Sequence, residues 1–319
     1  MTYLVTGGAG FIGANFLIYM INKYPKDKFI CLDKLTYAAN IKNLDSIMNK
    51  NNFTFIKGSI NNKKLLNKIF KENKIDTIVN FAAETSVDKS ISNPSIFIKT
   101  NINGTYNLLE MAKQYNVKRF HQISTDEVYG DLKLEDNKNF NEKSPLKPSN
   151  PYAVSKAGAD MLVLSYYRTY NVPISISRSS NNYGPFQHHE KLIPMTITNA
   201  LKGHEIPIHG NGKNIRDWIY VEDHVRAIDL IIKKGKIGEI YNIAGNYEQS
   251  NIEIAKTILK KLNKSNSLIS FVEDRPGNDL KYSLNTDKIV RKLSHKNQTN
   301  FENGLQKTIN WYKKNNFFI

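Results

Sequence analysis

The chain has 319 residues, of which 40% are hydrophobic, and a formal net charge of +16. This composition is ordinary for a globular protein and excludes wholesale disorder, and the length suits one large domain plus a smaller one. No apolar run reaches the length of a membrane-spanning helix, so we expect no membrane partner. The lysines are dispersed along the chain without a basic block or an aromatic-basic platform, so we expect no nucleic-acid partner.

Cysteine usage bears on the compartment of the protein. The only cysteine, Cys31, lies in the apolar run Phe29-Ile30-Cys31-Leu32, so an intrachain disulfide is impossible, as is typical of proteins in a reducing cytoplasm. The first residues enter an apolar strand at once, where a signal peptide would place a basic segment and then an apolar one. We therefore expect a cytoplasmic protein.

A glycine-rich turn follows the first expected strand, residues 2–6. Gly7-Gly8-Ala9-Gly10-Phe11-Ile12-Gly13 leads into a helix expected from about Phe16 to Tyr24. Glycines at these spacings allow a tight turn, close approach to a pyrophosphate and helix–strand packing, with the helix N-terminus facing the phosphates. Asp33 ends the second expected strand, twenty residues after Gly13, where a carboxylate can accept both ribose hydroxyls and repels a 2′-phosphate. The sequence therefore predicts a dinucleotide site that prefers NAD to NADP.

Strands and helices continue to alternate up to a strand expected at 174–178. This alternation predicts an α/β fold, a doubly wound parallel sheet of the Rossmann type, with ligands at the carboxyl ends of the strands. After that strand the pattern changes, so we expect a second, smaller α/β substrate domain. We assign 1–180 plus about 218–245 to the NAD-binding domain and about 181–217 plus 246–319 to the substrate domain.

Two further motifs carry the chemistry. Thr125, Asp126 and Glu127 follow the expected strand 119–124, and two adjacent acids can hold different protonation states. Tyr152 and Lys156 are four residues apart on one expected helix, so their side chains share a face. A nearby ammonium lowers the pKa of a tyrosine, which can then take a proton from an alcohol while hydride leaves to a nicotinamide. We predict these five as catalytic residues, the alternative being that the two acids only cap a turn.

The motifs together resemble those of extended short-chain dehydrogenases/reductases, and within them the dTDP-glucose 4,6-dehydratases. The resemblance rests on eight segments: Thr6 to Gly13, Asp33-Lys34-Leu35-Thr36-Tyr37, Ser124 to Gly130, Tyr152 to Lys156, Ser180 to Pro185, Glu190 to Pro194, Arg216-Asp217-Trp218 and Arg275-Pro276-Gly277. It implies that NAD⁺ oxidises C4 of the glucose unit, with Tyr152 as base and Thr125 bonded to the C4 oxygen. Glu127 would then remove the C5 proton and Asp126 would protonate the leaving C6 hydroxyl, before hydride returns to C6.

The resemblance also implies two sets of binding residues and no metal. The cofactor-binding positions are Gly7, Gly10, Phe11, Ile12, Gly13, Asp33, Lys34, Thr36, Ser59, Ile60, Ala82, Ala83, Tyr152 and Lys156. The positions for the nucleotide-sugar substrate are Ser86, Asn181, Lys191, Leu192, Pro207, His209, Arg216, Asn251 and Asn278. Asn181, Lys191 and Arg216 would lie near the diphosphate, and Arg216 suits it best because a guanidinium can bind a phosphate through two hydrogen bonds.

Several positions depart from the pattern of the family. Ser86 and Asn278 stand where histidine is usual, and Lys281 where arginine is common. Ser59 replaces an aspartate that contacts adenine, and His209 a tyrosine that stacks on thymine. The reaction is therefore better supported than the nucleotide, and UDP or CDP sugars remain alternatives. A 4-epimerase or decarboxylase of the same fold is a further alternative, which the two acids argue against. An NAD sensor without catalysis is another, but it would tolerate loss of Tyr152, Lys156 or the acids, and none is lost.

Two expected helices, 94–115 and 152–170, carry apolar residues beyond those needed to face the sheet. These are Leu108, Leu109, Met111, Met161, Leu162 and Leu164. The resemblance implies that such residues pair into a four-helix interface, so we expect a homodimer.

Overall fold

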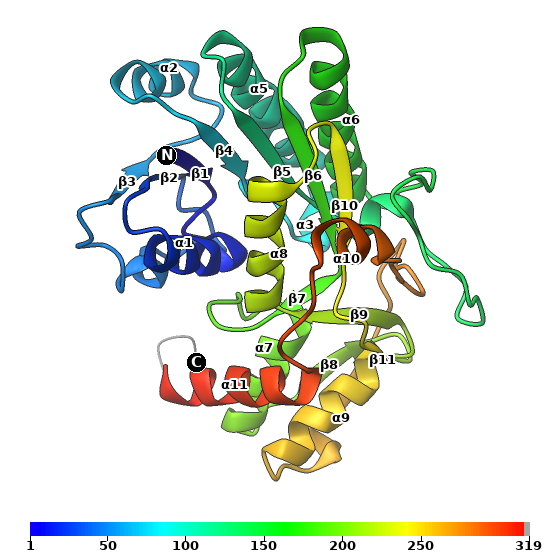
Figure 1. Cartoon of the computed structure of the whole chain (residues 1–319). Helices are drawn as coiled ribbons and strands as arrows, with labels where there is room; N and C mark the ends of the chain where they lie inside the picture. Colours follow the sequence, from blue (N-terminus) through cyan, green and yellow to red (C-terminus); the bar gives the residue numbers. More distant parts are fainter. Residues whose placement is uncertain (316–319) are drawn as a thin grey trace.

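The computed structural model describes residues 1–315, and within them the largest sheet has seven strands, all parallel (Figure 1). Across the sheet the order is β10, β6, β5, β4, β1, β2, β3. The bounds are β1 Thr2–Thr6, β2 Lys28–Asp33, β3 Phe53–Lys57, β4 Thr77–Asn80, β5 Arg119–Thr125, β6 Ile174–Ser179 and β10 Glu239–Ile243. This order, with β1 inside the sheet between β4 and β2, confirms the doubly wound Rossmann sheet.

Helices cover both faces of this sheet, as the near-continuous apolar strands require. The helices α1 (Phe11–Lys23) and α8 (Val221–Lys234) pack on one face, and α2 (Lys63–Glu72), α5 (Gly104–Gln114) and α6 (Pro151–Tyr170) pack on the other. The start of α6 is fixed locally, because the Asn150 side chain accepts a hydrogen bond from Ala153 N (2.9 Å) and Pro151 occupies the first turn.

The helix expected over 94–115 is interrupted. Its place is taken by α4 (Pro94–Phe97), a π-helical turn (Ile98–Asn103) and α5, preceded by a short helix α3 (Val87–Ser92). The wider turn directs Asn101 inward, where its amide bonds both backbone groups of Glu84, at 2.8 and 3.0 Å, and donates to Ser155 Oγ at 2.8 Å. A π-turn of this kind is common at functional sites, and here it ties the chain after β4 to α6.

Within residues 1–315, the smaller domain is built from a three-stranded sheet and a pair of parallel strands. The strands are β7 (Asn181–Tyr183), β9 (Ile215–Tyr220) and β11 (Glu248–Ser250) in the sheet, and β8 (Ile206–His209) with β12 (Ile269–Val272) in the pair. Its helices are α7 (Leu192–Lys202), α9 (Asn251–Lys261) and α11 (Phe301–Lys314). Side chains of all three helices meet in one apolar core, which holds Ile197, Ile258 and Ile309.

One helix lies on the other side of the proposed domain division. Helix α10 (Asp287–Leu293) packs against α8 and β10, where Ile289 is buried with Tyr241 and Ile243. The segment 246–319 therefore contributes to both units. Our boundaries remain a proposal, with α10 as an element that belongs by its packing to the large sheet.

The apolar residues that suggested a helix interface divide into two groups. Leu108, Leu109 and Met111 are buried in the core between the sheet and its helices, so placing them at an interface was wrong. Leu162 and Leu164 are partly buried against the same core, whereas Met161 is 60% exposed. Sequence spacing did not separate these sets, because α5 turns its apolar face inward and α6 is apolar on more than one side.

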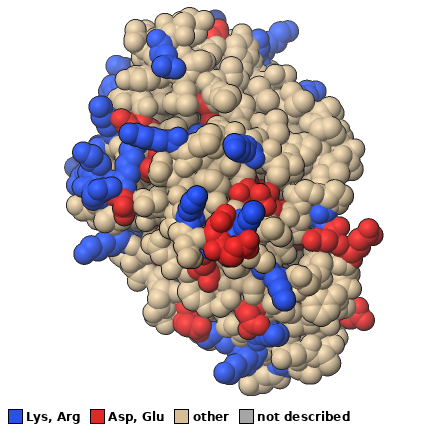
Figure 2. Space-filling view, turned by 90° about the vertical axis from the view of Figure 1, so that its right-hand side faces the viewer, with Lys and Arg blue, Asp and Glu red and all other residues tan. Residues whose placement is uncertain are grey.

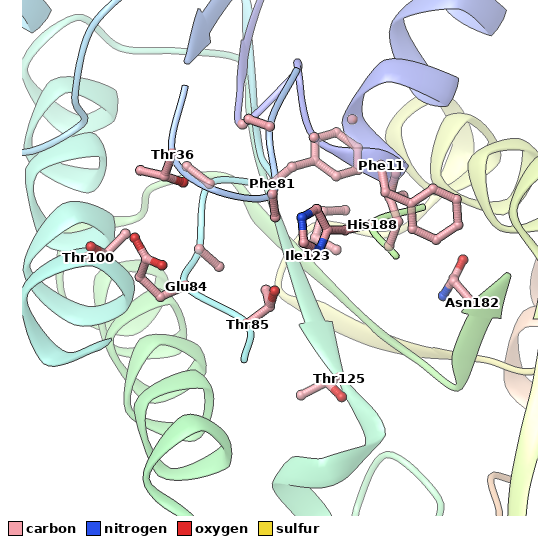
Figure 3. Close-up of a pocket in the computed structure, with 18 of the residues that line it drawn as sticks. Phe11, Thr36, Phe81, Glu84, Thr85, Thr100, Ile123, Thr125, Asn182 and His188 are labelled. Carbon is pink, nitrogen blue, oxygen red and sulfur yellow. The ribbon is translucent and has the colours of Figure 1, made fainter. Parts of the chain in front are cut away.

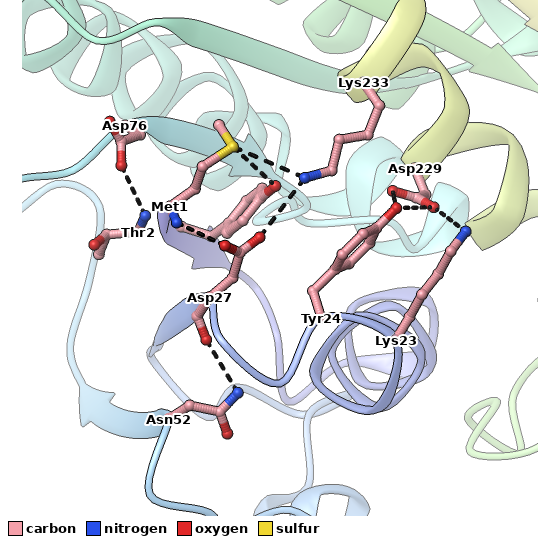
Figure 4. Close-up of polar contacts among 10 residues, drawn as sticks. Met1, Thr2, Lys23, Tyr24, Asp27, Asn52, Asp76, Asp229 and Lys233 are labelled. Carbon is pink, nitrogen blue, oxygen red and sulfur yellow. Dashed lines mark hydrogen bonds and ion pairs between the residues drawn. The ribbon is translucent and has the colours of Figure 1, made fainter.

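Charged groups at the amino edge of the sheet join α1 to α8 (Figure 4). The Lys23 ammonium pairs with Asp229 at 2.7 Å, Tyr24 bonds the same carboxylate at 3.1 Å, and the Met1 amine pairs with Asp27 at 2.6 Å. On the face in Figure 2 the basic side chains are spread out, with acidic ones between them. In residues 1–315 no helix is long and apolar enough to cross a membrane, and no group of three or more potential metal ligands occurs.

Candidate active site

The carboxyl ends of the central strands open onto a cleft of about 310 Å³ (Figure 3). It brings together all the predicted catalytic and cofactor-binding residues, with two of the predicted substrate residues. These are Gly7, Gly10, Phe11, Ile12, Gly13, Asp33, Lys34, Thr36, Ser59, Ile60, Ala82, Ala83, Thr125, Asp126, Glu127, Tyr152, Lys156, Asn181 and Lys191. The two motifs that carry chemistry and the glycine turn therefore share one cavity, and their individual roles remain predictions.

The other predicted substrate residues are not among the described residues that line the cleft. They are Ser86, Leu192, Pro207, His209, Arg216, Asn251 and Asn278. Ser86 caps α3 by accepting from Lys89 N at 3.4 Å, and Asn251 begins α9 with its N–H bonded to Asn214 O at 3.1 Å. These two positions have local structural roles.

Residues that were not among the predicted site residues also line the cleft. They include Phe81, Glu84, Thr85, Thr100, Ser179, Ser180, Asn182, Gln187, His188 and Glu190. Of these, Ser180, Asn182 and Glu190 lie in segments that carry the family resemblance. Figure 3 shows His188 and Asn182 of the smaller domain facing the same space as Thr125 and Glu84. Glu84 and Thr85 directly follow Ala82-Ala83 after the end of β4, and this position next to predicted cofactor-binding residues could have identified them as cleft residues. Thr100 lies in the π-turn, which no regular periodicity predicts.

The glycine turn has the shape of a phosphate cradle. A Cβ on Gly7, where φ is +69°, would lie 2.6 Å from Ala82 N, and one on Gly13 would lie 2.3 Å from Gly7 O. A Cβ on Gly10 would meet only Gly7 O, at 3.3 Å, among the described atoms. Gly10 is also the N-cap of α1, and no described side chain caps that end. Free N–H groups at a helix N-terminus beside an open approach suit a pyrophosphate.

Asp33 completes the fit to a dinucleotide. Its carboxylate is held at the end of β2 by Ala9 N (2.9 Å) and Leu35 N (2.7 Å). Burial raises the pKa of this carboxyl, while the two N–H groups lower it. The fixed carboxylate lines the cleft and keeps free lone pairs that can accept ribose hydroxyls. The residues present therefore fit NAD.

The predicted catalytic triplet begins with Thr125 at the end of β5, which caps a short 3₁₀ turn (Asp126–Tyr129) that holds the two acids. The Thr125 hydroxyl accepts from Glu127 N at 3.3 Å and donates to Asp126 Oδ1 at 3.1 Å. The other oxygen, Asp126 Oδ2, is buried and has no hydrogen-bond partner within residues 1–315. The capping of a turn and a catalytic role are therefore compatible, because Thr125 supplies the cap and leaves Asp126 free.

The two acids have different electrostatic surroundings. Burial and the neighbouring Glu127 charge raise the pKa of Asp126 well above its ordinary value. Burial also raises the pKa of Glu127, but the charges of Lys191 and Arg216 oppose that shift. The surroundings therefore favour the protonated form more strongly for Asp126 than for Glu127, which is the order that the predicted elimination requires.

The Tyr152–Lys156 pair differs from the expectation in one respect. Burial and the charges of Glu127 and Asp126 raise the pKa of Tyr152 well above its ordinary value, so the expected lowering is wrong for this structure. The Lys156 ammonium donates instead to Ile123 O at 2.6 Å, and burial lowers its pKa to about 8. Among the neighbouring groups, Thr125 is the one that lowers the pKa of Tyr152, against the larger effects that raise it.

Arg216 links the acids to the segment that contains Asn278. Its guanidinium donates to Asn278 Oδ1 (3.3 Å) and Asp279 O (2.9 Å) and lies 4.5 Å from the ring centre of Tyr282. Its charge also lowers the pKa of both Asp126 and Glu127. Arg216 is therefore close to the catalytic acids although it does not line the cleft.

The parallel sheet, the glycine turn and a tyrosine four residues before a lysine define an extended short-chain dehydrogenase/reductase. The family model for GDP-mannose 4,6 dehydratase matches residues 4–308. The chain is 47% identical to dTDP-glucose 4,6-dehydratase of Haemophilus influenzae, over 98% of each chain.

Solved structures agree with this match. The dTDP-glucose 4,6-dehydratase DesIV of Streptomyces venezuelae, with NAD and TYD bound, superposes with a TM-score of 0.96 at 43% identity over 100% of this chain and 98% of that one. The enzyme of Bacillus anthracis in complex with NAD gives a TM-score of 0.93 at 46% identity over 99% and 98%. The chain therefore belongs to the family of dTDP-glucose 4,6-dehydratases.

Proposed function

We propose that the protein converts dTDP-glucose to the 4-keto-6-deoxy sugar nucleotide by removing water across C5 and C6. One observation carries this proposal: two acids with different electrostatic surroundings, the buried Asp126 and the partly exposed Glu127, line one cleft with Tyr152 and Lys156. Oxidation alone requires only the tyrosine and the lysine. An epimerase or decarboxylase does not need a second acid–base pair, so the pair favours elimination.

When bound, NAD⁺ supplies the hydride acceptor for C4 and returns the hydride at the end of the cycle. The chain supplies the proton transfers. Tyr152 takes the proton of the C4 hydroxyl, and Thr125 bonds the C4 oxygen. The C4 ketone acidifies the C5 proton, which Glu127 removes, while protonated Asp126 gives its proton to the leaving C6 hydroxyl to form water.

The nucleotide part of the substrate lies toward the smaller domain. Asn181 and Lys191 line the cleft from that side, and the Lys191 ammonium donates to Thr85 O at 3.2 Å. Arg216 lies beyond the acids. Amide and cationic groups in this position suit a diphosphate.

The direct test is to offer dTDP-, UDP-, CDP- and GDP-glucose in parallel and to measure the 4-keto-6-deoxy product by its absorbance in alkali. We expect product from dTDP-glucose foremost. The control is the Asp126→Asn/Glu127→Gln double variant, which keeps the shape of the site without its acid–base pair. Formation of a C4 epimer that keeps its C6 hydroxyl would contradict the proposal.

We also propose that the protein is a cytoplasmic homodimer, with the outer surfaces of α5 and α6 pairing with a second copy. Tyr106, Val154, Met161 and Tyr170 are exposed on these two helices, and Ile98 on the adjacent π-turn. Exposed large apolar side chains that gather on one surface mark protein–protein contacts. Light scattering should give twice the chain mass for the wild type and the mass of a single chain for Met161→Glu. A monomeric wild type at micromolar concentration would reject the dimer.

A further inference from the structure

A buried ion pair lies beneath the catalytic lysine. Asp160 follows Lys156 by one turn of α6, so both side chains lie on the same helical face. The Asp160 carboxylate is fully buried, and its Oδ2 accepts from Ser124 Oγ and from Arg178 Nε, both at 2.9 Å. Its other oxygen, Oδ1, is buried and has no hydrogen-bond partner in the described part of the chain.

The Asp160–Arg178 ion pair contacts both ends of the turn that holds Asp126 and Glu127. Arg178 on β6 lies beside Ser124 in the strand register, and Ser124 immediately precedes Thr125. The Arg178 guanidinium also lies 4.8 Å from the ring centre of Tyr129, which ends the turn and donates to Asn242 Oδ1 at 2.8 Å. One carboxylate therefore connects the residue before the turn, the residue at its end and the helix that carries Lys156.

We propose that Asp160 is a positioning residue for the redox step, and that its carboxylate is the buried counter-charge that keeps the Lys156 ammonium protonated beside Tyr152. The hydrogen bond to Ser124 and the ion pair with Arg178 hold this charge in place. This inference rests on the roles proposed above for Tyr152 and Lys156.

Energetics support a role beyond stability. Placing two charges in the interior costs several kcal/mol in desolvation, and replacing a buried ion pair with apolar residues is often neutral or stabilising. The side chains of Arg178 and Asp160 are 2% and 0% exposed, so the desolvation cost of this ion pair offsets most of the stability that it contributes. The place of Asp160 one helical turn after the predicted catalytic lysine gives the pair a second use, because a fixed charge in a low-dielectric site acts strongly on its neighbours.

The charged groups around Lys156 make its dependence on Asp160 specific. Tyr152 and Asp160 share its helix, Asp126 and Glu127 lie on the turn after β5, and Arg178 lies on β6. Among the charges in this surrounding, that of Asp160 is the one that raises the pKa of Lys156, while burial lowers it. Without Asp160, burial would act unopposed and the Arg178 charge would add to it.

The first experiment measures the lysine itself. Protein labelled with ¹³C at lysine Cε is titrated by NMR, and Lys156→Met assigns the signal. Asp160→Asn, which keeps the shape of the side chain, should weaken proton binding to Lys156 by about ten- to a hundredfold and so lower its pKa, because the opposite charge one helical turn away is lost.

Two matched variants separate charge from structure. Arg178→Gln leaves Asp160 unpaired and should raise the pKa of Lys156, in the direction opposite to Asp160→Asn. Ser124→Ala keeps both charges and should leave the pKa unchanged. If Asp160→Asn does not fold, the Asp160→Asn/Arg178→Gln double variant removes both charges together and should give a value between those of the two single variants.

The second readout is the pH profile of C4 oxidation in a single turnover, followed by the absorbance of reduced nicotinamide. In Asp160→Asn the alkaline limb should move to lower pH with the Lys156 titration. Unchanged titration in Asp160→Asn, or shifts of the same sign in Asp160→Asn and Arg178→Gln, would overturn the inference. A wild type that forms no dehydrated product while Lys156 still responds to Asp160 would refute the proposed function and leave the coupling intact.

Discussion

Replacing Glu127 with glutamine should separate the redox half of the reaction from the elimination. Gln has nearly the shape of Glu, and the Glu127 N–H that bonds Thr125 Oγ1 at 3.3 Å is a backbone group, so the turn should persist. Tyr152 and Lys156 are untouched, so C4 oxidation should proceed. Loss of a general base typically costs about 10²–10⁴-fold, which corresponds to about 3–5 kcal/mol on the elimination barrier.

Stopped-flow absorbance should show reduced nicotinamide accumulating on the Glu127→Gln variant without a matching amount of product. Tyr152→Phe is the control, because it should block reduction of the cofactor itself. The elimination needs an ionised Glu127, so its rate in the wild type should rise as pH increases through the raised pKa of that carboxyl, and this limb should vanish in the variant. In D₂O the wild-type product should carry deuterium at C5. Turnover of Glu127→Gln at the wild-type rate would remove Glu127 from the mechanism.

Three further perturbations follow from single contacts. Burial lowers the pKa of both His121 and His224 from 6.5 to about 3, so the unfolded chain binds more protons than the folded one between these pH values. The free energy of unfolding should therefore fall as the pH drops below 6.5, by at most about 1.4 kcal/mol per pH unit per histidine. A free energy of unfolding from denaturant titrations that stays constant down to pH 5 would contradict this. Gly10→Ala should weaken NAD binding by about tenfold or more in calorimetry with little change in thermal stability, since the added Cβ points at the phosphate approach. Arg216→Lys should raise KM for the sugar nucleotide by about ten- to a hundredfold and change kcat less, because lysine cannot bind a phosphate through a planar fork; equal losses in both would point to the acids instead.

Much of the fold and cleft was predictable because local patterns and topology agree. A strand, a glycine turn and a helix specify their own geometry, and a parallel sheet brings the ends of β1, β4 and β5 to one edge. That is why residues as distant in sequence as Gly10 and Lys156 could be placed in one cavity. The order of the elements predicts that these motifs meet at one edge, whereas the individual binding positions came from the motifs and from the family resemblance.

The parts that were missed depend on three-dimensional surroundings. Helical periodicity does not tell which apolar face of α5 meets the sheet, so Leu108 and Leu109 were assigned outward although both are buried. The π-turn at 98–103 has no periodic signal, because it inserts a residue into an otherwise helical pattern. The pKa of Tyr152 depends on burial and on two carboxylates as well as on the lysine four residues away, so spacing alone gave the wrong direction.

The core of the smaller domain sets an order on biosynthesis. Phe301, Leu305 and Ile309 of α11 fill the space between α7 and α9, so that core cannot close until the chain beyond residue 300 has left the ribosome. The main sheet is complete by β10, whose last residue is Ile243. Because domains generally fold as units, the N-terminal one first, the glycine turn and the catalytic helix can assemble on a nascent chain whose smaller domain still lacks α11. A late stall in translation should therefore leave the main sheet formed and the core between α7 and α9 open.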